Sequence, residues 1–407
     1  MSELDHDIVC LSSQPWRDSM WTNKQHIMSR LAERHRVVYA DHGIRSLPGY
    51  LFDRIKDDPT ALARPGRLLT EGVHREEDGL WIAESYGPLL ANLLSVECPV
   101  RNFVAYDLKL KFLKRFLERK QIDDPIVWVY HPAYAEAVDD LPRKLLVYDC
   151  VDNYRAFPNY QDSADWIDDK ERRLCEKADL VFTTAQELYD EKSKYNPEHT
   201  HLVHNVGDAE HFKQALDDET PVAEEVASLS SPVIGFVGAV SDYKLNSDWL
   251  LELSRRKPDW NIVVIGPVGV ADASTDVSAM KKASNIHLLG YRDYEDLPTY
   301  LKGFDVATIP YRINEYTRSV FPIKFFEFMA TGTPVVISAL PSLEEYYDQV
   351  EVAETADEFV ERCEAALQLG DEGADERIEL AEQNSWWSRI DKMMGLVEDR
   401  LDERALG

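Results

Sequence analysis

The feature that most constrains the fold is an alternation of short β-rich runs with helical stretches, which occurs twice along the chain. Each run is short, rich in β-branched or aromatic residues, and bounded by turn residues or charge, as buried strands usually are. Alternating strands and helices favour parallel sheets joined by crossover helices. We therefore predict an α/β protein with two successive Rossmann-like domains.

The predicted elements fall into two sets. In the first half we predict strands at 7–12, 36–41, 126–130, 145–149 and 179–183 and a helix at 22–34. In the second half we predict strands at 233–237, 262–265, 286–289, 305–309 and 334–338, with helices at 247–256, 294–303, 322–331 and 356–369. A chain of 407 residues exceeds what one core usually holds, which agrees with two domains.

The boundary between the domains is predicted from composition. Between Asp208 and Glu225 there are seven acidic residues and one lysine, a composition typical of an exposed linker near 208–231. We place the first domain at 1–210, the second at 211–382 and a terminal helix at 383–407. Trp386 and Trp387 on that helix are expected to anchor it against another surface.

Charge and cysteine content exclude several classes of function. The net charge is −29, so we expect no nucleic-acid partner, because phosphate contacts need basic surface. The five cysteines are scattered, without the Cys/His spacing of a zinc site, and we expect no metal or other cofactor. No apolar run is long enough to span a bilayer and the start of the chain is acidic, so we expect a cytoplasmic protein.

Three groups of side chains follow predicted strands, where open α/β sheets bind ligands. Gly238 would let the backbone approach a ligand, and Lys244 could reach a phosphate; a solvated loop lysine is the alternative. A second segment precedes and begins the helix at 322–331, where Glu327 could accept from ribose hydroxyls, or could be a surface glutamate on an amphipathic helix. His131 ends a strand of the first half, where it could position a substrate hydroxyl or merely pack.

Two carboxylates of the first half, Asp149 and Asp152, also follow a strand. Their spacing alone is a weak indication of a metal, since no further ligands accompany them.

These residues together resemble the retaining GT-B glycosyltransferases of family 4, most closely over 232–340. That family has a glycine and a lysine in the loop after the first strand of its donor domain, matched by Gly238 and Lys244. It also has a glutamate before a Gly-x-Pro-Val-Val return, matched by Glu327 and by Gly332-Thr333-Pro334-Val335-Val336.

The resemblance implies the GT-B architecture, in which two Rossmann-like domains face each other across a cleft and the last helix crosses back to the first domain. It implies transfer of a hexose-type sugar from a UDP- or GDP-sugar to a lipid-linked or polysaccharide acceptor with retention at the anomeric carbon. The implied catalytic residues are His131, Lys244 and Glu327. The implied donor-binding residues are Gly238, Lys244, Arg318, Ser319, Val320, Lys324 and Glu327.

The sequence departs from the family at two positions. Ala239 stands where the family has an arginine that grips the donor diphosphate, and Ser319 stands in place of the first of two glutamates. Arg312 or Arg318 could supply the missing charge. Two alternatives therefore stay open: a non-catalytic nucleotide-sugar-binding subunit of a glycan assembly complex, and a GT-B nucleotide-sugar epimerase.

A basic amphipathic segment lies between Arg101 and Lys120. It holds seven basic and two acidic residues, a net +5 (7 − 2) in an acidic chain. Such a helix can lie on an anionic bilayer, which predicts peripheral contact with the inner face of the cell membrane and access to a polyprenyl-linked acceptor. The alternative is that its apolar stripe packs on the sheet and its basic face is solvated.

Overall fold

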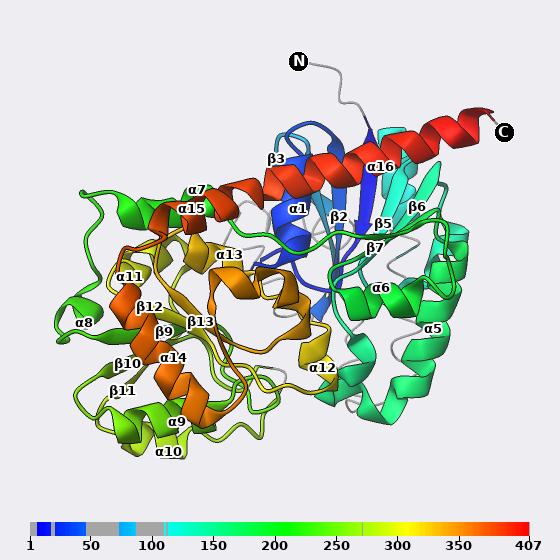
Figure 1. Ribbon diagram of the computed structural model, residues 1–407. Coiled ribbons are helices and arrows are strands. Elements are labelled where there is room, and N and C mark those ends of the chain that lie inside the picture. The colour runs from blue at the N-terminus through cyan, green and yellow to red at the C-terminus, as the bar shows by residue number, and fades with distance from the viewer. Residues whose placement is uncertain are drawn as a thin grey trace.

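The computed structural model describes residues 6–17, 21–45, 73–86, 110, 113–270 and 272–406. These residues form two sheets, one from each half of the chain, with helices packed around them (Figure 1). The strand order is β3-β4-β2-β1-β5-β6-β7-β8 in the first sheet and β11-β10-β9-β12-β13-β14 in the second. The predicted pair of parallel α/β units is confirmed.

The first sheet is parallel except for β3, which runs antiparallel to β4. Alternate residues of its central strands face opposite sides: Ile8 belongs to the core under the terminal helix, and Val9 to the core on the other face. Its strands are β1 (Asp7–Leu11), β2 (Arg36–Arg45), β3 (Val73–Glu77), β4 (Leu80–Tyr86), β5 (Ile126–Val129), β6 (Leu145–Cys150), β7 (Leu180–Thr183) and β8 (Thr200–Leu202). Its helices include α1 (Asn23–Leu31), α5 (Ala164–Lys177) and α6 (Gln186–Lys192).

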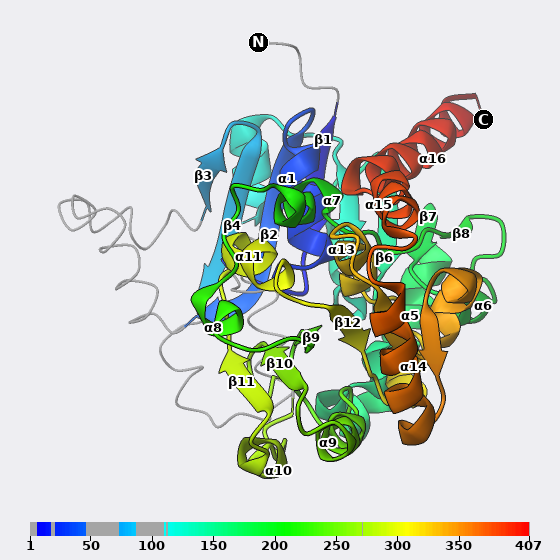
Figure 2. The ribbon, with the colours of Figure 1, turned by 60° about the vertical axis from the view of Figure 1, so that its left-hand side comes forward.

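The second sheet is parallel throughout and has a single apolar core. Its strands are β9 (Val233–Val237), β10 (Asn261–Ile265), β11 (Ile286–Gly290), β12 (Val306–Ile309), β13 (Val335–Ser338) and β14 (Glu351–Ala353). The helices around it are α9 (Ser247–Arg256), α10 (Ser278–Lys282), α11 (Leu297–Leu301), α12 (Glu315–Arg318), α13 (Lys324–Met329), α14 (Ala356–Leu369) and α15 (Ala374–Gln383). In the turned view, α9 and α10 lie at the end of the molecule away from the terminal helix (Figure 2).

All ten predicted strands are present, and only β2 extends more than one residue beyond its predicted end. Four further strands were not predicted from the sequence. β3 and β4 carry charged residues within their length, and β8 and β14 are three-residue strands at sheet edges. Short or charged edge strands lack the apolar run on which the prediction depends.

The predicted exposed linker at 208–231 is wrong for part of its length. The segment forms α7 (Ala209–Phe212), a 3-10 turn and α8 (Glu224–Ala227). Ala209, Phe212 and Val226 are buried in the core of the second sheet, and Ala215 is also buried. The acidic residues between these apolar positions dominate the composition, which therefore conceals the packed face.

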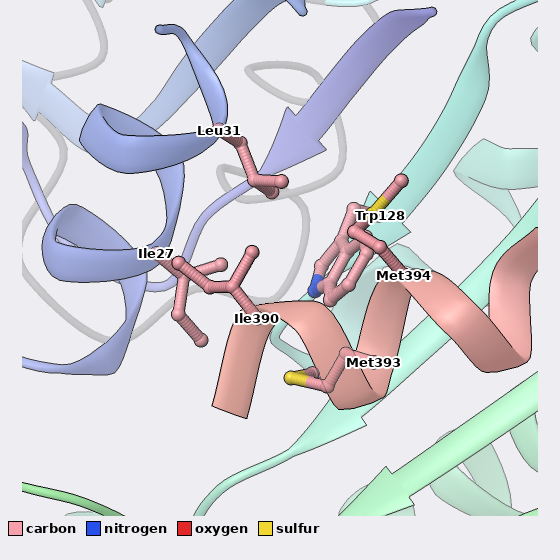
Figure 3. A pocket seen from close by; sticks show the side chains of 6 residues that line it. All are labelled: Ile27, Leu31, Trp128, Ile390, Met393 and Met394. Atoms are coloured by element: carbon pink, nitrogen blue, oxygen red, sulfur yellow. The ribbon is translucent and has the colours of Figure 1, made fainter. Parts of the chain in front are cut away.

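The terminal helix α16 (Trp386–Leu406) leaves α15 beside the second sheet and runs across α1 (Figure 1). Trp386, Ile390, Met393 and Val397 are buried in the core of the first sheet, so the predicted return of this helix is confirmed. Figure 3 shows the contact from close by. An apolar pocket there is lined by Ile27, Leu31, Trp128, Ile390, Met393 and Met394.

The basic segment is described only in part, because 101–109, 111 and 112 lie outside the described residues. Of the remainder, Leu113, Phe116 and Leu117 are buried against the first sheet. Lys120 holds its ammonium nitrogen 3.9 Å from the centroid of the Trp81 ring. The apolar stripe of the described turns therefore packs inward, so these turns could contact a membrane through their charges and not through that stripe.

No helix within the described ranges has both the length and the apolar character needed to cross a bilayer.

Replacing Trp386 with alanine should lower the free energy of unfolding by roughly 3–5 kcal/mol, because it removes a large ring that is 2% exposed and stacked on His26. Trp387→Ala is the matched control. The ring of Trp387 is half-buried and contacts the Arg34 guanidinium at 4.3 Å, an interaction of about 0.5–1 kcal/mol. Denaturant unfolding of both variants measures the difference, and equal losses would contradict the anchoring role of Trp386.

Candidate functional site

Residues that follow strands of the two sheets meet at one interface. The phenol of Tyr316 donates to Asp152 Oδ1 at 3.4 Å, and Phe157 lies edge-on to the Tyr316 ring at 4.7 Å. Nearby, Ser319 Oγ donates to Glu187 Oε2 at 3.4 Å. The segment after β6 and the segment between β12 and α13 are therefore in direct contact.

The loop after β9 carries Gly238 and Lys244. Its path is held by the neighbouring loop, because a Cβ at Gly266 would lie 1.9 Å from the Gly238 oxygen. Gly266 has a φ of +144°, a conformation that favours glycine. The Arg312 amide donates to the Lys244 carbonyl at 2.8 Å, so the loops after β9 and β12 are joined.

The side chain of Lys244 is half-buried and lies over an aromatic ring, 4.7 Å from the centroid of Tyr311. Burial acts to lower the pKa of Lys244, but Tyr311, Tyr243 and Asp152 outweigh it and raise that pKa above its ordinary value. Lys244 is therefore a fixed positive charge at neutral pH.

Glu327 lies in the first turn of α13 and is 1% exposed. Its Oε2 atom is 2.5 Å from the ammonium of Lys324, one turn earlier. Burial raises the pKa of Glu327, and the positive charge of Lys324 only partly offsets this. The structure thus excludes the surface alternative for Glu327 and pairs it with Lys324, another residue of the predicted donor site.

The backbone between the two sheets approaches Glu327 closely. A Cβ at Gly207 would lie 2.8 Å from the Glu327 amide nitrogen, so glycine is needed at this crossing. Arg30 of α1 pairs with Asp208 at 2.8 Å, next to the crossing. Glu327 is therefore set at the junction between the sheets.

An aromatic cluster surrounds the same junction. His26 of α1 stacks on Trp386 at 4.7 Å and contacts Tyr294 at 5.6 Å. Tyr294 stacks in turn on His211 at 4.5 Å, and the Lys324 ammonium lies 5.7 Å from the Tyr294 ring. Burial, Arg30 and Lys324 hold the pKa of His26 well below its ordinary value.

A hydrogen-bonded network at the junction has members that sequence reasoning missed. Asn205 accepts from Asn23 at 2.5 Å and from Arg389 at 2.7 Å, and donates to the Phe321 carbonyl at 2.7 Å. Arg389 also lies 3.6 Å from Asp149, and both side chains are 0% exposed. The partners of Arg389 lie more than a hundred residues away in the sequence, so no local pattern identifies this residue.

His131 is 3% exposed and its ring is held on both sides. Nδ1 accepts from the Ala133 amide at 3.1 Å, which assigns the proton of the neutral ring to Nε2. Nε2 lies 3.2 Å from the Tyr160 hydroxyl, and Tyr154 packs edge-on at 4.5 Å. His131 thus lies in the segment next to Asp152 but is engaged with its own domain.

The side chains of the two arginines considered as substitutes for the missing charge are engaged elsewhere or exposed. The Arg312 guanidinium pairs with Asp248 at 3.1 Å, and the Arg318 side chain is exposed. The amide of Val320, a residue of the implied donor site, donates to the Thr317 carbonyl at 3.1 Å. Arg312 thus contacts the Lys244 segment through its backbone, while its charge is paired with Asp248.

The two carboxylates after β6 face different partners. Asp149 is buried against Arg389, whereas Asp152 lies 3.7 Å from the Lys24 ammonium. Within the ranges that the structure describes, no three His, Cys, Asp or Glu side chains gather where they could hold a metal ion.

Part of the chain is similar in sequence to known glycosyltransferases. The family model "Glycosyl transferases group 1" matches residues 231–368. A Bacillus subtilis (strain 168) protein named for a glycosyltransferase of teichuronic acid biosynthesis, TuaH, is 30% identical over 230 residues, which are 54% of this chain and 57% of that protein. The chain thus spans just over half the length of the curated relative it matches.

Solved structures share the whole fold. A sucrose-phosphate synthase from Thermosynechococcus elongatus superposes with a TM-score of 0.71 at 15% identity, over 97% of this chain and 98% of that one. A trehalose-6-phosphate structure from E. coli bound with UDP-2-fluoro glucose gives 0.69 at 11% identity, over 97% and 99%. At such identities the likeness shows the two-domain fold.

The stability of the protein should fall as pH drops below about 6.5, the ordinary pKa of histidine. The depressed pKa of His26 means that the unfolded chain binds a proton in this range while the folded chain does not, so acid favours unfolding. The loss is at most about 1.4 kcal/mol per pH unit for one such group. Denaturant unfolding at pH 7.0, 6.0 and 5.5 measures it.

His26→Gln is the matching variant, because glutamine cannot take up the proton. As the pH falls, the free energy of unfolding of this variant should decrease less steeply than that of the wild type, by the contribution of one histidine. Parallel slopes would show that other groups set the acid sensitivity.

Proposed function

We propose that this chain, whose residues 231–368 match the group 1 glycosyl transferases, is itself a glycosyltransferase and moves a hexose-type sugar from a nucleotide-sugar to a glycan acceptor. The observation that carries the proposal is the position of Lys244. It is a half-buried cation in the loop after β9, inside the matched segment, and it lies over the Tyr311 ring. Developing charge on a departing diphosphate is stabilised by such a preset cation.

The reaction we propose retains configuration at the anomeric carbon. The bond between that carbon and the diphosphate oxygen breaks, and the acceptor hydroxyl attacks from the same face. The acceptor proton passes to the departing oxygen, so that no protein nucleophile is used. Glu327 binds the ribose hydroxyls through its carboxylate, and Lys324 favours the charged form of that carboxylate against the effect of burial.

The second sheet would bind the donor and the first sheet the acceptor. We keep the division into 1–210, 211–382 and 383–407, with Gly238, Lys244, Ser319, Lys324 and Glu327 toward the donor; the exposed Arg318 and the Val320 amide, which is bonded to Thr317, are left out. His131 is placed to position a donor or acceptor hydroxyl if its contact with Tyr160 opens. A UDP-sugar is the first donor to test, because a structural relative is bound with UDP-2-fluoro glucose; GDP-sugars are the second.

The acceptor we propose is a lipid-linked or polysaccharide glycan at the inner face of the cell membrane. Support comes from the relative named for teichuronic acid biosynthesis, which points to a polymeric acceptor.

A non-catalytic donor-binding subunit is the second candidate, favoured by Ala239 and Ser319 at two positions where the resembled family carries charge. Donor consumption with and without glycan acceptors separates the candidates. A transferase consumes donor in step with acceptor, a binding subunit consumes none, and an epimerase alters the sugar without an acceptor.

Lys244→Ala should lower the turnover of the donor by about 10²–10³-fold, the usual effect of losing one electrostatic donor to a departing oxyanion. Initial rates at saturating donor measure the change. Arg312→Ala is the control, because that guanidinium pairs with Asp248 and should leave turnover within about twofold of wild type. Wild-type turnover in Lys244→Ala would remove Lys244 from the mechanism.

Contact of the described turns with the membrane should depend on charge, because their apolar residues Leu113, Phe116 and Leu117 are buried. Sedimentation with anionic liposomes at low salt should bring the wild type down, and about 0.15 M salt, where the Debye length is near 8 Å, should release it. A variant with Lys114, Arg115 and Arg119 changed to Glu should stay in the supernatant. Equal behaviour of the two proteins at low salt would end the membrane proposal.

A further inference from the structure

One lysine is a small counter-charge for a departing diphosphate. The arginine of the resembled family is replaced by Ala239, and the two nearby arginines face Asp248 or solvent. A second positive charge must come from another element if the proposed transfer occurs, and the first sheet offers one. This role for a residue of the first sheet rests on the proposed function.

Lys24 lies in the first turn of α1, directly after the loop that follows β1. Its position is fixed by its neighbour Gln25, whose Oε1 accepts from the Thr22 amide at 3.2 Å and whose Nε2 donates to the Pro15 carbonyl at 2.9 Å. Although lysine is rarely buried, Lys24 is only 4% exposed. The fold therefore holds a cation at the carboxyl edge of the first sheet.

Asp152 is the one described carboxylate within ion-pair range of Lys24, at 3.7 Å. That distance is longer than the 2.7–2.9 Å or so of a charge-assisted hydrogen bond, so this ammonium keeps hydrogen-bonding capacity for another anion. Asp152 also accepts from Tyr316 of α12 at 3.4 Å, and the Tyr316 ring packs at 5.2 Å on Tyr243, the residue before Lys244. Asp152 thus connects Lys24 of the first sheet to the segment of the second sheet that carries Lys244.

We propose that Lys24 is a second binding residue for the donor diphosphate, which it contacts from the first domain while Lys244 contacts it from the second. Asp152 is the anion that holds Lys24 when no donor is bound. The diphosphate, with more negative charge than one carboxylate, takes over Lys24 from Asp152. A nucleoside monophosphate reaches only one domain, so the two lysines together favour ligands with two phosphoryl groups.

Isothermal titration with UDP, GDP, UMP and GMP tests this proposal on the full chain. Lys24→Met should weaken the binding of the nucleoside diphosphate by roughly 10- to 100-fold, the worth of one hydrogen bond to a charged group. It should change monophosphate binding by less than about threefold, because the monophosphate does not reach Lys24. Lys24→Arg should restore most of the diphosphate affinity.

Two further variants serve as controls. Lys257→Met makes the same chemical change at the far end of α9, where the lysine pairs with Glu364, and should leave both affinities unchanged. Lys24→Gln keeps a hydrogen-bonding group at the buried position, so that a folded neutral variant is available if Lys24→Met is unstable. Thermal midpoints establish that each variant is folded.

The outcomes separate this inference from the function on which it rests. Wild-type protein that binds neither UDP nor GDP contradicts both. Wild-type binding that is unchanged in a folded Lys24→Met or Lys24→Gln variant overturns the role of Lys24 alone. An equal loss of diphosphate and monophosphate affinity would also overturn it, because it would reveal a general disturbance of the site.

Discussion

A buried ion pair joins the last helix of the chain to the centre of the first sheet. Arg389 of α16 lies 3.6 Å from Asp149 at the end of β6, and neither side chain is exposed. Removing one partner of such a pair is costly, since the other charge stays buried. Arg389 also donates to Asn205, which holds the Phe321 carbonyl ahead of α13. One guanidinium therefore ties the terminal helix, the crossing between the sheets and the segment that leads to Glu327.

The positions of the candidate binding groups follow from that arrangement. Lys244 lies in the loop after β9 and Glu327 in the first turn of α13, which follows the neighbouring strand β12; parallel strands place the segments that follow them at the same edge. Lys24 and Asp152 come from the corresponding edge of the first sheet. Any shift of α16 would move these two edges relative to each other. The packing of Trp386 against His26 thus bears on the chemistry although neither ring is a proposed substrate contact.

The sequence was informative where a physical rule is local. Apolar runs predicted ten of the strands, and the Gly-x-Pro return located α13 and β13. The edge strand β3 and its neighbour β4 were missed, because their charged residues break the apolar pattern. The apolar face of 208–231 was missed, because acidic residues outnumber its buried ones. The pairing of Lys24 with Asp152 joins residues more than a hundred positions apart, so no local sequence pattern could predict it.

The charges of the interface explain how so acidic a chain could hold an anion. With a net charge of −29, the protein repels a diphosphate at long range, and three of its basic groups at the junction are paired with carboxylates: Lys324 with Glu327, Arg30 with Asp208, Lys24 with Asp152. Lys244 lies instead over the Tyr311 ring. An arriving anion can therefore meet Lys244 directly but must replace a carboxylate at each of the other three groups. Long-range repulsion is screened over about 10 Å at 0.1 M salt, whereas buried contacts are screened much less. Selection among anions then falls to geometry at short range, where a cation from each sheet can meet only a ligand long enough to reach both.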